Sequence, residues 1–278
     1  MKNTIKLAAS AAVIALFAAA PASAQDKSII VQSTTSTANS GLLDYLLPKF
    51  TEKSGVAVNV VAVGTGQAIK NAQNCDGDVL LVHAKPSEEK FVADGYGVER
   101  FDLMYNDFVI VGPAADPAGV KGMNDVEGAL KKIADAKAPF ASRGDDSGTH
   151  KKEQSLWKAA GIEPSGDWYS STGSGMGATL NTGVGLGAYV LTDRATWISF
   201  GNKGDFAIDV EGDDELFNQY GVILVNPEKC PSVKQAEGQA FIDWLLSAEG
   251  QNDIRGFQID GQQLFFPNAD PGQMKKAG

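Results

Sequence analysis

The amino-acid sequence predicts an α/β fold of two lobes, each a mainly parallel sheet flanked by helices. β-rich segments alternate with segments of helical spacing along most of the 278 residues, which is typical of parallel strands joined by helical crossovers. Two stretches rich in glycine, proline or aspartate, 112–122 and 201–214, interrupt the alternation. No repeat with a period of about 20–50 residues is visible, which argues against a solenoid.

The first part of the chain contains four predicted strands and three predicted helices. Runs of β-branched and apolar residues predict strands at 29–31, 56–63, 78–83 and 101–111. Leucines at helical spacing predict a helix at 41–50, and Gly64-Thr65-Gly66 precedes a second at 67–73. Pro86, followed by two glutamates in the first turn, begins the third.

The second part of the chain continues the same alternation. We expect helices at 129–136, 149–160 and 236–249, the last two ended by Gly161 and Gly250. Strands are expected at 139–142, 189–191 and 221–225. The two interruptions predict that the chain crosses between the lobes twice. Lobe I would then be discontinuous (25–111 and 200–278), and lobe II would comprise 112–199.

The first 24 residues have the pattern of an export signal. Lys2 and Lys6 precede an apolar run from Leu7 to Ala20, and Ala22-Ser23-Ala24 supplies a small-residue cleavage site. The run is shorter than the roughly 20 residues that span a bilayer. We therefore expect a periplasmic protein. Cleavage removes two lysines and no acid, which changes the formal net charge from −10 to −12.

Charge and motifs exclude several functions. A sequence pI of about 4.7 argues against nucleic acid as a partner, because phosphate neutralisation needs a basic face. The phosphate-binding P-loop and the dinucleotide fingerprint are both missing from the sequence. Two cysteines and two distant histidines lack the spacing of a metal site, so we expect neither a metal nor a cofactor. An even number of cysteines in an exported chain predicts a disulfide between Cys75 and Cys230. Two separate buried thiols are the alternative.

Four predicted strand-to-helix junctions are rich in small hydroxyl residues and glycine. They are Ser33-Thr34-Thr35-Ser36-Thr37, Gly64-Thr65-Gly66, the segment from Ser142 to Thr149, and the segment from Thr172 to Gly177. The first turn of a helix has free N–H groups and a positive dipole end, which bind anions. Four such ends facing one cleft could hold a tetrahedral oxyanion. Simple helix capping is the alternative for any one of them.

Arg143 is the candidate cation of this site. It lies within a donor-rich loop, and its planar fork can bind two oxygen atoms at once. A structural ion pair with Asp145 or Asp146 is the alternative. The nearby Ser147 and His150 raise a further possibility, a serine hydrolase. Proximity in sequence is weak support for it, because catalytic triads are defined by geometry.

The motifs resemble those of one known family, the tungstate-binding periplasmic proteins of tungstate ABC importers (the TupA type). The matching segments run through nearly the whole mature chain. They are STTSTANSGLL from Ser33, VGTGQA from Val63, DVLLVH from Asp78, MYNDFVIVGP from Met104, SRGDDSGTH from Ser142, GMG from Gly175 and LTDRATW from Leu191.

This resemblance implies a type II-like periplasmic solute-binding fold with the ligand between the lobes. It implies a monomer that binds tungstate, with molybdate as a competitor, and delivers it to a membrane permease. It assigns the anion site to Ser33, Thr34, Thr35, Ser36 and Arg143, where Ser33 stands for the family's usual threonine. The helix-end argument adds Thr65 and Ser147. The cysteines lie outside the family pattern and are expected to be a local stabilising addition.

The identity of the oxyanion stays open at this level. Tungstate and molybdate are bare dianions that only accept hydrogen bonds, so a donor-only site suits them. Phosphate near pH 7 carries a proton and needs an acceptor, which Asp145 or Asp146 could supply. Sulfate differs from tungstate chiefly in size. A phosphate- or sulfate-binding protein is therefore the alternative within the same class.

Overall fold

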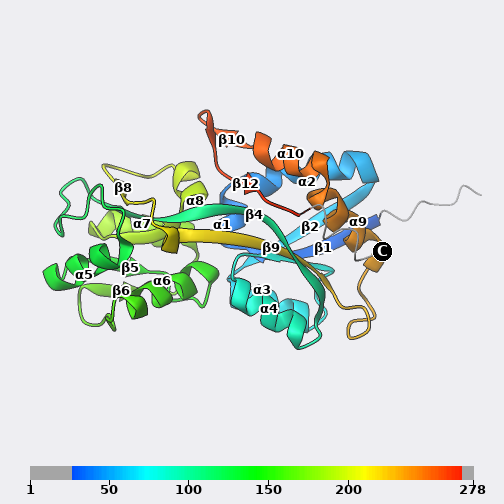
Figure 1. Ribbon diagram of the computed structural model, residues 1–278, viewed down its shortest axis with the longest axis horizontal. Coiled ribbons are helices and arrows are strands. Elements are labelled where there is room, and N and C mark those ends of the chain that lie inside the picture. Colours follow the sequence, from blue (N-terminus) through cyan, green and yellow to red (C-terminus); the bar gives the residue numbers. More distant parts are fainter. Residues whose placement is uncertain (1–26, 271–278) are drawn as a thin grey trace, which may run out of the picture.

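The computed structural model describes residues 27–270, and the predicted export signal at 1–24 lies outside the described residues. The chain forms an elongated molecule with two lobes (Figure 1). Two long strands, β4 (Gly97–Gly112) and β9 (Phe217–Val225), run along its centre. Within 27–270, no helix is long and apolar enough to cross a membrane.

The first lobe is built on a mixed sheet with the strand order β12-β4-β9-β3-β1-β2. Its other strands are β1 (Lys27–Thr34), β2 (Val56–Val63), β3 (Val79–Val82) and β12 (Phe266–Pro267). β1 runs parallel to both β2 and β3, as predicted. β9 returns from the second lobe and pairs antiparallel with both β3 and β4, and β12 also pairs antiparallel with β4.

Helices cover the two faces of this sheet. They are α1 (Thr35–Asn39), α2 (Leu42–Ser54), α3 (Thr65–Gln73), α4 (Lys85–Ala93), α9 (Gln235–Leu246) and α10 (Ala248–Gly256). A short hairpin of β10 (Gln258–Ile259) and β11 (Gln262–Gln263) follows α10. One core cluster packs Phe50, Phe241 and Trp244 against β1 and β3. A second packs Ala68 and Ala72 of α3 against Leu80 and Phe91.

The second lobe has shorter elements. They are α5 (Val126–Ala136), β5 (Phe140–Ser142), α6 (Gly148–Ala159), β6 (Tyr169–Ser171), α7 (Met176–Leu186), β7 (Val190–Asp193), α8 (Arg194–Ser199), β8 (Ala207–Val210) and the 3₁₀ turn η1 (Asp214–Leu216). β5 and β6 are parallel. The end of β4 pairs antiparallel with β7 and β8, so this strand belongs to both lobes.

The packing of the core bears on where the chain crosses between lobes. Phe108 and Ile110 of β4 pack with Val210 and Leu216 in the second lobe. The boundaries at 112 and 199 stay a prediction. We propose crossings a few residues earlier in β4 and near the start of β9, because these apolar side chains share the second lobe's core.

The predicted disulfide is confirmed, since Cys75 and Cys230 are bonded across 155 residues of sequence. Cys75 follows α3, and Cys230 lies in the loop between β9 and α9. The bond therefore lies within the first lobe and joins an early segment of the chain to a late one.

Candidate oxyanion-binding site

The four predicted junctions are helix N-termini in the structure. Thr34 caps α1 by accepting a hydrogen bond from Thr37 N at 3.2 Å, and Ser147 caps α6 by accepting from His150 N at 3.1 Å. Gly64 and Gly175 occupy the cap positions of α3 and α7 without a side-chain bond. Capping and a ligand site are compatible, because a cap satisfies only one of the free N–H groups.

Contacts between the lobes bring these helix ends together. Gly148 N, at the start of α6, donates to Thr65 Oγ1 of α3 at 2.8 Å. Arg143 Nη2 donates to Thr35 Oγ1 of α1 at 3.1 Å. A Cβ atom built on Gly175 would lie 3.3 Å from the same threonine oxygen. α1 lies between the two lobes in Figure 1. The lobes are therefore closed on each other around the hydroxyl-rich segments.

Arg143 is the only cation of the predicted set, and it is 99% buried, since its relative exposure is 1%. Its Nη2 atom donates to Thr35 and, at 2.5 Å, to Asp145 Oδ2. Its Nε and Nη1 atoms have no partner among the residues that the structure describes. A buried charged donor left unpaired carries a large desolvation cost. The free side of this guanidinium is therefore suited to an anion.

Both carboxylate oxygens of Asp145 accept hydrogen bonds from residues of its own loop. Oδ1 accepts from Ser147 N at 3.2 Å, and Oδ2 accepts from Arg143. Burial opposes ionisation of this carboxyl, but hydrogen bonds from Ser147 and the charge of Arg143 outweigh it and hold the pKa of Asp145 below its usual range. Asp146 is mostly exposed and pairs with Lys151 at 3.5 Å. The alternative of a structural pair for Arg143 is thus part of the arrangement, but it occupies only one nitrogen.

The buried His83 side chain contacts the hydroxyl-rich segment 33–37. Its Nε2 atom lies 3.1 Å from Thr34 Oγ1 and 2.9 Å from Ser36 Oγ, and its Nδ1 atom lies 3.0 Å from Asn218 Oδ1. Its ring stacks on Tyr220 at a centroid distance of 4.7 Å. Burial, together with the positive charge of Arg143, lowers the pKa of His83 to about 4 against the opposing hydrogen bond with Asn218. The ring is therefore neutral at pH 7.

The predicted hydroxyls do not all face the same way. Thr35 contacts Arg143, and Thr65 contacts the other lobe. Ser33 instead donates to the Leu81 carbonyl at 2.8 Å, inside the first lobe. Thr34 and Ser36 share His83 and lie 3.1 Å from each other.

Sequence reasoning missed His83, Asn218 and Thr196 as members of this region. Thr196 Oγ1 lies 3.1 Å from the Ser36 carbonyl oxygen and 2.7 Å from Asp193 Oδ2. The TDRATW segment was a signal for Thr196, but its place against α1 depends on the closed lobes. Asn218 lies 135 residues from His83, so only the fold joins them.

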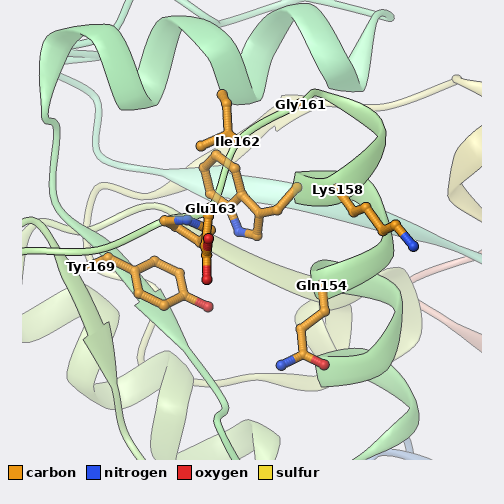
Figure 2. Close-up of a pocket in the computed structure, with 8 residues that line it drawn as sticks. Gln154, Lys158, Gly161, Ile162, Glu163 and Tyr169 are labelled. Atoms are coloured by element: carbon orange, nitrogen blue, oxygen red, sulfur yellow. The ribbon is translucent and has the colours of Figure 1, made fainter.

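A separate cavity of about 570 Å³ lies in the second lobe (Figure 2). Gln154 and Lys158 of α6 line one side, and Ile162, Glu163 and Tyr169 line the other. It contains none of the predicted site residues. Concavity alone therefore does not locate the site, which is identified by the unpartnered donors of Arg143.

Comparison with known proteins agrees with this geometry. The PBP superfamily domain matches residues 19–249. The tungstate-binding protein TupA of Peptoclostridium acidaminophilum is 53% identical to this chain, over 87% of this chain and 86% of its own length. The chain belongs to the TupA family.

Solved structures of the TupA family have the same architecture. The tungstate-binding protein TupA of Desulfovibrio alaskensis G20 is 50% identical and superposes with a TM-score of 0.74, over 88% of this chain and 100% of its own. A tungstate ABC transporter structure from Geobacter sulfurreducens is 49% identical with a TM-score of 0.77, over 83% and 98%. The family resemblance and the two-lobed fold class are thereby confirmed. The family's members are binding proteins of ABC transporters rather than enzymes.

Proposed function

We propose that this TupA-family chain binds tungstate between its lobes, with molybdate as a competitor, and delivers it to the permease of an ABC importer. The observation that carries the proposal is the buried guanidinium of Arg143, which presents two unpartnered donors at the lobe interface. Hydroxyls and helix N-termini surround it. Such a set of donors stabilises a dianion that offers only acceptor atoms.

The arrangement of Asp145 disfavours phosphate. A protonated phosphate needs a hydrogen-bond acceptor in its site. Each oxygen of Asp145 already accepts one bond, from Arg143 or Ser147, and the pKa of this carboxyl is lowered, so Asp145 is a weaker acceptor for the phosphate proton. Asp146 is paired with Lys151 outside. Sulfate is a bare dianion as well, so its rejection rests on the size of the closed site.

The geometry also disfavours a serine hydrolase. The Ser147 hydroxyl accepts from the His150 backbone N–H as a helix cap. The His150 imidazole is turned elsewhere, because its Nδ1 atom accepts from Asp146 N at 3.1 Å. A nucleophile needs its base within hydrogen-bonding reach of the hydroxyl.

Lobe closure is the proposed mechanism of capture. The ligand favours the closed form only through contacts that it makes with the second lobe, and Arg143 supplies them. We expect small-angle X-ray scattering to show a smaller radius of gyration with tungstate than without it. Identical profiles in both conditions would contradict closure.

Calorimetric titration of ligand-stripped protein tests the function. We expect tight binding of tungstate and molybdate, and weak or no binding of sulfate and phosphate. Arg143→Ala should weaken tungstate binding at least about 100-fold, because it removes a buried charge-assisted contact of about 3 kcal/mol or more. Arg255→Ala, an exposed arginine of α10, is the matched control and should bind like the wild type. Binding of phosphate alone would overturn the proposal.

The cellular setting follows from the family and the charge. We propose a periplasmic monomer whose partners are the oxyanion and a membrane permease. Nucleic acid is not a partner, because the mature chain's net charge of −12 repels it.

A further inference from the structure

Another cavity of about 570 Å³ lies between the two lobes, next to His83, which contacts the hydroxyl-rich segment 33–37. The first lobe contributes His83 and Lys85, at the junction of β3 and α4. The second lobe contributes Gly148, Lys151 and Lys152 of α6. Because the walls come from both lobes, this cavity must change shape when the lobes separate.

The lining of this cavity carries three lysines and no acid. Two acids stand at its rim, where Asp146 lies 3.5 Å from Lys151 and Glu215 lies 3.8 Å from Lys152. Both distances exceed those of a charge-assisted hydrogen bond, so the ammonium groups can turn toward another anion. In a chain of net charge −10, this cluster is a local attraction for anions against a repulsive background.

The cavity and the oxyanion site share a wall. The His83 ring lines the cavity and also contacts Ser36 of the site, at 2.9 Å. Gly148 also lines the cavity, and its N–H donates to Thr65 across the interface between the lobes. Separation of the lobes breaks the Gly148–Thr65 contact. The lysine-lined space then becomes continuous with the hydroxyls and with Arg143.

We infer that this cavity is the route by which the oxyanion reaches the site, and that Lys85, Lys151 and Lys152 capture the anion before the lobes close. This inference rests on the proposed function. Lysine suits transient capture, because its ammonium group is a mobile, strongly hydrated point charge. The rigid fork of Arg143 suits final binding. The lysines therefore act on the association rate rather than on the bound state.

Stopped-flow tryptophan fluorescence with tungstate, at several salt concentrations, tests the route. In the double variant Lys85→Gln/Lys152→Gln, the second-order association rate should fall at least about threefold at low salt, since local charge raises such rates by about 10- to 1,000-fold. The dissociation rate should not change, and the salt dependence of association should become shallower. Lys132→Gln, on the outside of α5, removes one charge remote from the cavity and should have little effect.

A variant with the opposite expected effect on the association rate completes the test. Glu215→Gln frees Lys152 from its rim partner and should raise the association rate. An association rate in the double variant equal to that of Lys132→Gln would overturn the inference. So would a faster dissociation with unchanged association, because the lysines would then hold the bound anion. Two tungstate ions per chain in a titration would also overturn it, whereas failure of the wild type to bind tungstate would instead refute the proposed function.

Discussion

Glu153 on α6 is a buried carboxyl that lies outside the ligand site. Its Oε1 atom accepts from the Tyr169 hydroxyl at 2.6 Å and from Trp157 Nε1 at 3.2 Å. Removal from water raises the pKa of Glu153 to about 7, and the hydrogen bonds from Tyr169 and Trp157 only partly oppose this. At the residue scale, burial therefore changes the protonation of a group that does not itself belong to the ligand site.

This pKa predicts a loss of stability as pH rises. Between the ordinary pKa of 4.5 and the folded value of about 7, the folded state keeps a proton that the unfolded state releases. From pH 5 to pH 8, Glu153 should thus lower the free energy of unfolding by roughly 1–3 kcal/mol. Urea unfolding of Glu153→Gln at both pH values should show a smaller loss than the wild type.

That experiment needs a control variant, and some dependence of the unfolding free energy on pH should remain. Glu52→Gln, an exposed residue of α2, should keep the wild-type slope. Glu88 also has its pKa raised to about 7 by burial, against the opposing charge of Arg100, so some pH dependence should remain. A slope in Glu153→Gln as steep as that of the wild type would contradict the assignment.

At the scale of elements, the start of α6 makes a close contact between the lobes. A Cβ atom built on Gly148 would lie 3.0 Å from Thr65 Oγ1 and 3.1 Å from the His83 carbonyl oxygen. Both neighbours belong to the first lobe. A side chain at this position therefore obstructs the closed form, whereas within its own helix alanine is more favourable than glycine.

Gly148→Ala should impair closure of the lobes without impairing folding. We expect its tungstate affinity to fall about 10-fold or more, which corresponds to about 1.4 kcal/mol of lost closure energy. Its thermal stability without ligand should not fall. Gly185→Ala in α7 is the matched control, because a Cβ there meets nothing within 4 Å. It should gain up to about 1 kcal/mol in stability and bind normally. Equal affinities of the two variants would rule out this role of Gly148.

At the scale of the whole molecule, the disulfide and the long strands hold the first lobe together. The Cys75–Cys230 bond closes a loop of about 155 residues that includes the entire second lobe. β4 and β9 pass between the lobes and pair with each other along most of their length. The second lobe is thus inserted between two segments of the first lobe, and its two connections, β4 and β9, are hydrogen-bonded to each other.

Removal of the disulfide should therefore affect stability and spare binding. Cys75→Ala/Cys230→Ala should lose about 2–4 kcal/mol of stability, since the cross-link restricts the unfolded chain. Thermal unfolding measures this loss. The tungstate affinity at low temperature should stay within a factor of two, because both cysteines lie away from Arg143. A large loss of affinity in the folded variant would show that the bond positions the site.

The sequence by itself determined the elements whose signals are local. The strand at 56–63 was predicted with the bounds observed, and the helix predicted at 149–160 is found at Gly148–Ala159. Alternation of apolar and polar residues predicts the strand, and apolar residues at helical spacing predict the helix. Both patterns involve only residues that are close together in sequence. The start of α7 was predicted at the junction from Thr172 to Gly177, but its extent was not, because its three glycines weaken the helical pattern. β6 and β8 are short strands that exist only through pairing with β5 and β4.

The donors of the site were likewise visible in the sequence, whereas their convergence was not. Hydroxyls, glycines and one arginine at strand-to-helix junctions predicted an oxyanion. Only the tertiary structure joined His83 to Asn218, placed Arg143 against Thr35 and left two donors of Arg143 unpartnered. Arg143 meets Thr35 only where the two lobes pack against each other. The free energy that fixes these contacts arises between segments that are far apart in the chain.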